Sequence, residues 1–285
     1  MGFNINTLRM LLRIRQSGVE LGKVLTIGRQ GLTVNSACLR TLLRGVVDNR
    51  DTVQAISDSR WAEPLLRALG ATSIDSLDAS SFENATIIHD LNTPVPASLH
   101  RRFDTVIDGG SLEHVFDVRQ AVMNVMQMTR RSGNLLCHNP ADSYFGHGLY
   151  QFSPEFYFRV FCKENGFRLN EVFIHEGRET STWRRVPDPA TVRRRLWRRG
   201  ATPTMALAWA TCIEEATPFS TMVPQQSDYE AAWQGTGESA GGKKGLLSGI
   251  KGLLPPRVRR AIVSIIRSRD PAMVPVKYDP RSEYR

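Results

Sequence analysis

The sequence predicts an α/β fold with a mainly parallel sheet that is covered by helices on both faces. Short apolar or β-branched runs alternate with segments of helical period from residue 23 to about residue 177, as in repeated strand–helix–strand units. One of these runs, Phe103–Val115 (FDTVIDGGSLEHV), reads as a buried strand, a glycine turn and the start of a helix. Open sheets of this kind bind ligands at the carboxyl ends of their strands, which makes Asp108 a candidate binding residue.

The individual elements are predicted from apolar period and from turn residues. Residues 1–20 carry apolar side chains at helical spacing and are expected to form a short amphipathic helix. Strands are expected over 23–27, 72–77 and 85–89, with helices over 36–47 and 61–69. After the next strand, Ser111 is expected to cap a helix with Leu112, Val115 and Phe116 on its inner face. One more strand or helix is expected over 205–213.

Composition divides the chain into three parts. They are an N-terminal helix (1–20), a main domain (21–233, with a core over 21–177 and a basic addition over 178–233), and a flexible linker with a basic amphipathic tail (234–285). The formal net charge is +9. From residue 241 onward, 11 Lys or Arg stand against 3 Asp or Glu, so most of this charge lies in the tail.

This basic balance favours anionic partners such as nucleotides, phosphates, nucleic acid or an acidic membrane surface. Residues 243–269 alternate apolar and basic side chains, which predicts reversible binding to anionic membranes. Nucleic acid is not expected there, because no aromatic residues interleave with the basic ones. An arginine cluster over 184–199 is either a solvated face or a site for a phosphate or sugar diphosphate.

The cysteines indicate a reducing compartment. Four cysteines are widely scattered with neither metal-site nor C-x-x-C spacing, so we expect free thiols, and no metal is expected in the protein. The first residues are too short and too interrupted by arginine for a signal peptide, and no run of about 18 apolar residues occurs. The protein is therefore expected in the cytoplasm, or attached peripherally to the inner face of the membrane.

Several segments in series carry a resemblance to a known superfamily. The FD strand and LEHV of Phe103–Val115 resemble the fourth strand of class I S-adenosylmethionine-dependent methyltransferases. Later pieces resemble the following helix, strand five, and the late helix and strand of that fold: 121–128, 131–140, 152–155 and 165–167. The resemblance covers roughly residues 20–177. It implies a Rossmann-like, doubly wound sheet and S-adenosylmethionine as the cofactor.

Two motifs are similar to a narrower bacterial methyltransferase-like family that is often encoded near surface-polysaccharide genes. They are GRQ at Gly28–Gln30 and GHGLYQFSPE at Gly146–Glu155. This resemblance implies O-methylation of a carbohydrate or sugar-nucleotide in surface-glycan synthesis. Thr26 and Gln30 depart from the superfamily pattern, where an acidic residue precedes a GxGxG loop. A non-catalytic scaffold or binding subunit at the membrane face of a glycan-assembly system is therefore the alternative.

The resemblance also assigns candidate site residues. Asp78 would accept the ribose hydroxyls, with Asp75 as a competitor, and Asp90 and Leu91 would contact adenine. The complete expected cofactor set is Gly28, Arg29, Gln30, Asp78, Asp90, Leu91, Asp108 and Gly109.

For catalysis, the loop after the fifth strand is expected to lie beside the cofactor's methyl group. His147 stands between two glycines and is expected to take the acceptor's proton, or else to structure the loop. Tyr150 and Asn139 are expected to orient the acceptor. Glu113 and His114 are expected mainly to order the helix after the fourth strand.

Overall fold

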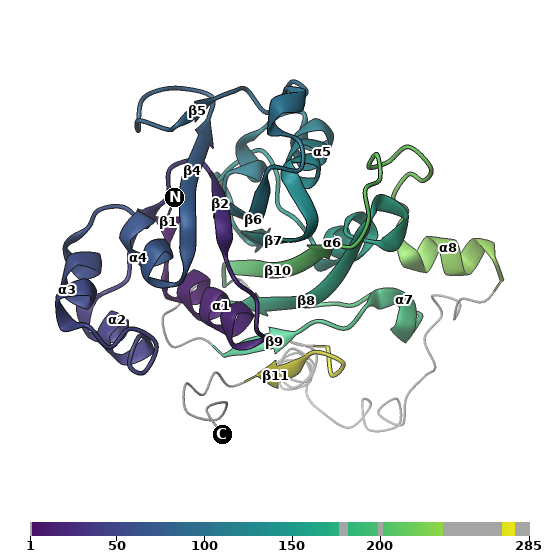
Figure 1. Cartoon of the computed structure of the whole chain (residues 1–285). Coiled ribbons are helices and arrows are strands. Elements are labelled where there is room, and N and C mark those ends of the chain that lie inside the picture. Colours follow the sequence, from purple (N-terminus) through teal and green to yellow (C-terminus); the bar gives the residue numbers. More distant parts are fainter. Residues whose placement is uncertain (1, 177–181, 199–201, 236–269, 277–285) are drawn as a thin grey trace, which may run out of the picture.

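The computed structural model describes residues 2–176, 182–198, 202–235 and 270–276, which form one large sheet with helices on both sides (Figure 1). The sheet has nine strands in the order β11-β9-β8-β10-β7-β6-β2-β4-β5. Their bounds are β2 (Gly22–Ile27), β4 (Ala71–Asp78), β5 (Ile87–Ile88), β6 (Phe103–Asp108), β7 (Thr129–Asp142), β8 (Phe167–His175), β9 (Trp183–Arg185), β10 (Thr204–Cys212) and β11 (Val274–Val276). A separate parallel pair joins β1 (Gly2–Phe3) to β3 (Gly31–Leu32).

Strand direction confirms the predicted fold class. Strands β5, β4, β2, β6 and β7 are mutually parallel, while β10 is antiparallel to both β7 and β8. Strand β9 is antiparallel to β8 and β11, so only β9 and β10 run against the other strands of this described sheet. The chain winds outward from β2 to β5 and then crosses to β6 on the other side of β2. This reversal is the switch point of a doubly wound sheet.

Helices cover both faces of the sheet. One hydrophobic cluster contains α1 (Ile5–Gln16), α2 (Ser36–Leu42), α3 (Arg50–Asp58) and α4 (Glu63–Ala68), and the opposite cluster contains α5 (Val118–Met128) and α6 (Pro154–Val160). The remaining described helical segments are α7 (Pro189–Val192), α8 (Ser227–Trp233) and the short 3₁₀ turns η1 (Ala97–Leu99), η2 (Leu112–His114) and η3 (Lys163–Asn165). The two clusters meet the sheet from opposite sides, as the alternating pattern predicts.

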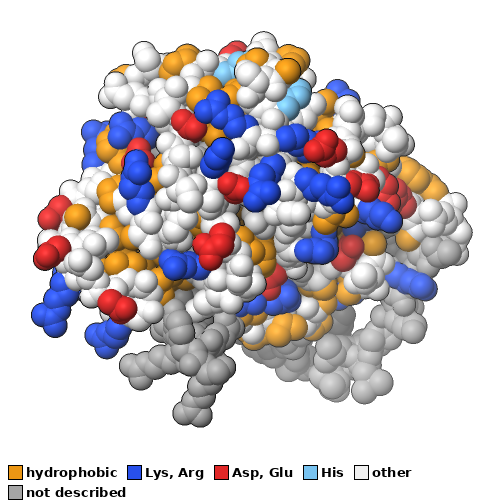
Figure 2. Space-filling model, in the orientation of Figure 1, with side chains coloured by type: hydrophobic (Ala, Val, Ile, Leu, Met, Phe, Trp, Pro, Cys, Tyr) orange, Lys and Arg blue, Asp and Glu red, His pale blue; other side chains and the backbone are white. Residues whose placement is uncertain are grey.

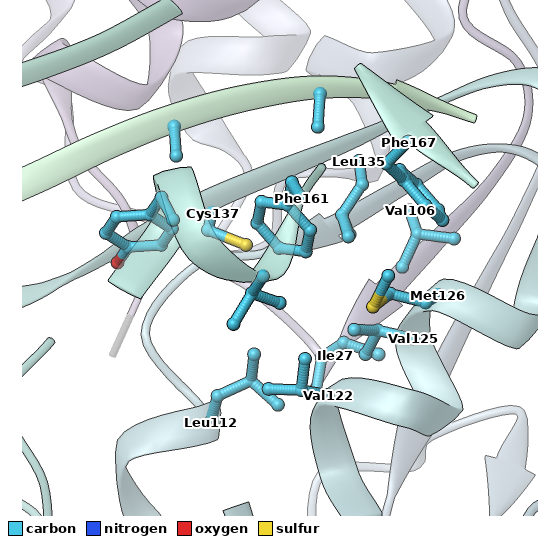
Figure 3. Packing of buried hydrophobic residues seen from close by; sticks show 14 of the residues in the cluster. Ile27, Val106, Leu112, Val122, Val125, Met126, Leu135, Cys137, Phe161 and Phe167 are labelled. Atoms are coloured by element: carbon cyan, nitrogen blue, oxygen red, sulfur yellow. The ribbon is translucent and has the colours of Figure 1, made fainter. Parts of the chain in front are cut away.

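Consecutive residues of a strand pack into the hydrophobic clusters on opposite faces of the sheet. Val106 and Leu135 belong to the α5 cluster, whereas Ile107 and Leu136 belong to the α1–α4 cluster. Successive strand side chains point to opposite faces, so a strand buried on both faces must be apolar at consecutive positions. Figure 3 shows the α5 side, where side chains of β6 and β7 meet Val122, Val125 and Met126 of α5.

The amino-terminal helix is confirmed and is part of the main core. Asn4 caps α1 by accepting hydrogen bonds from the backbone N–H groups of Asn6 and Thr7. The apolar side chains of α1 are buried and belong to the same hydrophobic cluster as those of α2, α3 and α4. The segment assigned to a basic addition also enters the main sheet, because β10 lies between β7 and β8. Of the two alternatives for 205–213, the strand is therefore correct.

The helix after the glycine turn differs from the prediction. Ser111 does not cap it: the Ser111 hydroxyl donates to the Ile27 carbonyl, and η2 gives way to α5, which begins at Val118 with Asp117 as its cap. Phe116 is 77% exposed instead of facing inward. The segment 108–112 is ordered by Asp108, whose Oδ1 accepts from three backbone N–H groups and competes successfully with local helix formation.

Helix α3 was not predicted from the sequence, although the Asn49 side chain caps it by accepting from the backbone N–H groups of Asp51 and Thr52. The predicted membrane-binding tail over 243–269 lies outside the described residues. Among the residues that the structure does describe, no helix is both long enough and apolar enough to cross a bilayer.

Candidate cofactor and acceptor site

A cavity of about 320 Å³ opens at the carboxyl ends of β2, β4 and β6, next to the switch point. Its volume lies within the range of small-molecule sites. The loops that follow these strands and the segment after β5 form its walls. They contribute Gly28, Arg29, Gln30, Asp78, Glu83, His89, Asp90, Leu91, Asn92, Gly110, Ser111 and His114.

The loop after β2 brings backbone to the cavity wall. Gly28 has a φ of +70°, and a Cβ there would stand 3.1 Å from the Ser111 hydroxyl oxygen, so this position requires glycine. Arg29 lines the cavity, but its guanidinium donates to Glu63 Oε1 at 2.7 Å and to the Glu83 carbonyl at 3.1 Å. It also lies over the ring of Trp61. Arg29 therefore clamps the loop in place, with its charge compensated by Glu63.

Gln30 fills the space that a second glycine would leave open. Its side chain is buried, and Nε2 donates to the Ile27 carbonyl at 2.6 Å. A Cβ on Gly109 would collide with Gln30 Oε1, so Gly109 is small in order to accommodate this amide. Gly109 and Asp108, which were expected at the mouth, lie beneath the cavity wall, and their neighbours Gly110 and Ser111 line it.

Two of the expected acidic residues border the cavity. Asp78 Oδ1 accepts from the Ser80 backbone, while Oδ2 faces the Gly28 loop, 3.9 Å from a Cβ placed there. Asp90 is exposed, and its hydrogen bonds from Asn92 lower its pKa below the ordinary value. The competitor Asp75 bonds to Thr86 and Arg102 outside the cavity. Geometry thus selects Asp78 over Asp75.

Beneath the cavity, two buried carboxyl groups share one amide. Asn139 Nδ2 donates to Asp108 Oδ2 at 2.6 Å and to Glu113 Oε2 at 3.0 Å. The Tyr157 hydroxyl donates to Asn139 Oδ1 at 2.9 Å, which fixes the amide's orientation. Asn139 is 1% exposed, so it orients Glu113 and does not reach an acceptor, contrary to expectation.

The environment of this pair favours the protonated carboxyl. Burial raises the pKa of Asp108. Burial, with the charge of Asp108 as a second cause, raises the pKa of Glu113 to about 8. Hydrogen bonds from Asn139 oppose both shifts without cancelling them. Glu113 accordingly holds a proton at neutral pH unless a positive charge is placed beside it.

The loop after β7 places His147 against Glu113. The backbone N–H groups of Leu149 and Tyr150 both donate to the Glu113 carbonyl, at 2.7 and 3.1 Å. Gly148 has a φ of +71°, and a Cβ there would lie 2.9 Å from Glu113 Cγ, so the glycine permits this close approach. His147 Nε2 then stands 3.7 Å from Glu113 Oε1, and the ring centroids of His147 and His114 are 5.1 Å apart.

The remaining candidates have structural partners. The Tyr150 hydroxyl donates to the Phe116 carbonyl and so links two loops, while its role in orienting an acceptor stays a prediction. In the arginine cluster, Arg185 pairs with Glu171, Arg195 with Asp228, and Arg198 with Asp142 and Glu176. Basic and acidic side chains are likewise interleaved over the face shown in Figure 2. These pairings favour the solvated face over a phosphate site.

Glu113 and His114 lie closer to the cavity than the sequence indicated. Both were treated as residues that order a helix, yet Glu113 is fully buried in the cluster and His114 lines the cavity. Tyr157 was not considered at all. The available signal was the LEHV motif itself, since a Glu and a His next to a glycine turn at the carboxyl edge of a sheet are placed for chemistry.

Comparisons with known proteins give distant likenesses. No protein-family model and no curated protein matches the sequence. Among solved structures, 1,6-didemethyltoxoflavin-N1-methyltransferase of Burkholderia thailandensis is 12% identical, with 74% of this chain and 78% of that chain covered and a TM-score of 0.39. An S-adenosylmethionine-dependent methyltransferase of Mesorhizobium loti is 14% identical, with 73% of this chain and 99% of that chain covered and a TM-score of 0.40. The branched-chain polyamine synthase of Thermus thermophilus is 15% identical, with 74% of this chain and 56% of that chain covered and a TM-score of 0.39.

Proposed function

We propose that this protein transfers a methyl group from S-adenosylmethionine to an oxygen atom of an acceptor. The observation that carries the proposal is the cavity at the switch point, which has Asp78 opposite Gly28 and has His114 in its wall. A cofactor held there would lie next to the cluster of Glu113, His114 and His147, where an acceptor can be activated.

The residues around the cavity fit this cofactor. Gly28 leaves room for a ligand to approach the backbone closely, and Asp78 presents an oxygen toward the same space. A carboxylate can accept hydrogen bonds from both hydroxyls of a ribose. Leu91, which is 5% exposed, offers an apolar surface, and the exposed carboxylate of Asp90 lies beside it. The bound cofactor would supply an activated methyl group.

The reaction also needs a route for the acceptor's proton. A hydroxyl is a poor nucleophile until that proton has a destination, and alignment with the methyl carbon is the enzyme's other task. His147 lies in the loop after β7, 3.7 Å from Glu113, at the same edge of the sheet as the cavity. We place the activation of the acceptor at His147.

We further propose a carbohydrate or sugar-nucleotide acceptor in surface-glycan synthesis. This rests on the resemblance of Gly28–Gln30 and Gly146–Glu155 to the narrower bacterial family, which is an argument by analogy. Phe145, two residues before His147, and Phe116, two residues after His114, are both largely exposed. Aromatic faces in such a position are suited to stack on the apolar face of a sugar ring.

A second candidate is a non-catalytic scaffold or binding subunit at the membrane face of a glycan-assembly system. Two observations favour it. Thr26 stands buried in β2 where the superfamily pattern has an acidic residue, and the Gln30 side chain occupies space in the glycine loop. Both changes remove features that would otherwise contact the cofactor.

Calorimetric titration with S-adenosylmethionine separates the two candidates. The wild type should bind, and Asp78→Ala should weaken binding by about 1–3 kcal/mol, because polar groups of the ribose lose their partner. Asp75→Ala, three residues earlier on β4 and outside the cavity, is the matched control and should bind normally. A wild type that does not bind the cofactor would favour the scaffold, and an unchanged Asp78→Ala affinity would remove Asp78 from the site.

A further inference from the structure

We propose that Glu113, His114 and His147 bind one divalent cation at the edge of the cavity, and that this cation takes the acceptor's hydroxyl as a ligand. The second part rests on the proposed methyl transfer, whereas the first stands on the geometry of the three side chains. No metal was expected from the sequence. His147 lies 33 residues beyond His114, so it meets the adjacent pair Glu113 and His114 only in the fold.

The spacing of the donor atoms suits a shared cation. Each of the three side chains offers one ligand atom, and these atoms all lie within 4.8 Å of one another. Glu113 Oε1 and His147 Nε2 are 3.7 Å apart, which is too long for a hydrogen bond. Two ligands of a tetrahedral metal at about 2.0–2.2 Å stand roughly 3.3–3.6 Å from each other. Small side-chain adjustments would therefore complete the site.

The two facing atoms lack other partners. Glu113 Oε1 and His147 Nε2 are both shielded from water, and neither has a hydrogen-bond partner among the described residues. Leaving a buried polar atom unsatisfied costs about 1–3 kcal/mol, and more for a charged group. One cation between these atoms would satisfy both of them.

The surroundings hold the proposed ligands in position. Glu113 Oε2 is occupied by Asn139, which is itself fixed by Tyr157 and Asp108, so Oε1 remains the free oxygen. His147 is held by the two backbone hydrogen bonds from its loop to the Glu113 carbonyl. Hydrogen bonds that fix a ligand's orientation in this way are a regular feature of metal sites.

A cation would also compensate the charge of Glu113 in its ionised form. Asp108 and Glu113 are both fully buried, and within the described part of the chain the one ion pair of Glu113 is with His147. Removing carboxylates from water without a compensating charge is costly. A divalent ion would supply that charge, and it would stabilise the ionised form of Glu113.

Two imidazoles and one carboxylate favour Zn²⁺, Mn²⁺, Fe²⁺ or Co²⁺. Three protein ligands leave a coordination position open for the acceptor. A hydroxyl bound there is more acidic, so its proton can pass to water. Its oxygen then attacks the methyl carbon, the carbon–sulfur bond breaks, and sulfur keeps the electron pair. His147 would act in this step as a metal ligand and not as the base.

The test measures metal binding without cofactor or acceptor. Full-length protein is stripped with a chelator and titrated with Co²⁺, followed by visible absorption, and with Zn²⁺ and Mn²⁺ by calorimetry. We expect one equivalent to bind, and His114→Ala and His147→Ala each to weaken binding at least tenfold. His100→Ala, an exposed histidine outside the cluster, is the control and should leave affinity unchanged. Because His114 is exposed, its substitution should not impair folding, which circular dichroism checks.

Two results would overturn the inference. One is the absence of stoichiometric binding of all three ions, or binding that neither His114→Ala nor His147→Ala weakens. The other is a His147→Ala protein that loses turnover and still binds metal as the wild type does, since His147 would then be a base. A wild type that binds metal but not S-adenosylmethionine would support the site while refuting the proposed methyl transfer.

Discussion

Replacement of Glu113 by Gln should change how stability depends on pH. In the folded protein, burial and the neighbouring charge of Asp108 raise the pKa of Glu113 to about 8, against an ordinary value of 4.5. Between these two values the folded state keeps a proton that the unfolded chain has lost. The free energy of unfolding contributed by Glu113 is therefore fully present below pH 4.5 and falls as pH rises toward 8.

The size of the effect follows from linkage. Within this window one proton separates the two states, so the free energy of unfolding falls by about 1.4 kcal/mol for each pH unit. Between pH 5.5 and 7.5 the loss should amount to roughly 3 kcal/mol. Gln has nearly the same shape and no titration, so Glu113→Gln should remove this part of the slope.

Urea unfolding at pH 5.5, 6.5 and 7.5 measures the slope. A chelator keeps the protein free of divalent ions, because a bound cation would favour the ionised carboxylate and reverse the effect. Glu215→Gln, at an exposed position, is the matched control and should follow the wild type. Parallel pH profiles for the wild type and Glu113→Gln would show that Glu113 is not protonated in the folded state, and the account of the buried pair would be wrong.

Two further predictions rest on contacts in the structure, and a third rests on the sequence of residues 243–269. Gly109→Ala should destabilise the protein by about 1–3 kcal/mol through its collision with Gln30, and Gln30→Ala should remove most of that cost in a double-mutant cycle followed by urea unfolding. His147→Ala should lower turnover with an identified acceptor by about 10²–10⁴-fold while S-adenosylmethionine affinity stays nearly intact; near-normal turnover would leave His147 a loop residue. A chain ending at Gly242 should lose binding to anionic liposomes relative to the full chain, most clearly at low salt, and equal partitioning would exclude residues 243–269 as the anchor.

The sequence by itself determined the parallel half of the sheet. Strands β2 and β6 were predicted within a few residues, because a doubly buried strand needs a continuous apolar run and that run is a local property of the chain. Strand β4 was also predicted, although its sequence, ATSIDSLD, is mixed and only partly buried. The ends of the strands also located Gly28 directly after β2, Asp78 at the last position of β4, and Asp90 two residues after β5. Local signals were weaker after the glycine turn. Ser111 is a residue type that often caps helices, yet Asp117 caps α5 and Asp108 orders the turn over 108–112.

The cluster of buried and titratable side chains around Glu113 could be recognised only in the tertiary structure. Glu113, Asn139, His147 and Tyr157 come from four segments, and only the folding of the β7 loop onto the Glu113 carbonyl brings Glu113 and His147 together. The insertion of β10 between β7 and β8 is decided in the same way, since strand pairing depends on partners distant in sequence. Periodicity reports which face of an element is apolar. It carries no information on which distant side chains that face will meet, and burial, shared hydrogen bonds and shifted pKa values all arise from those meetings.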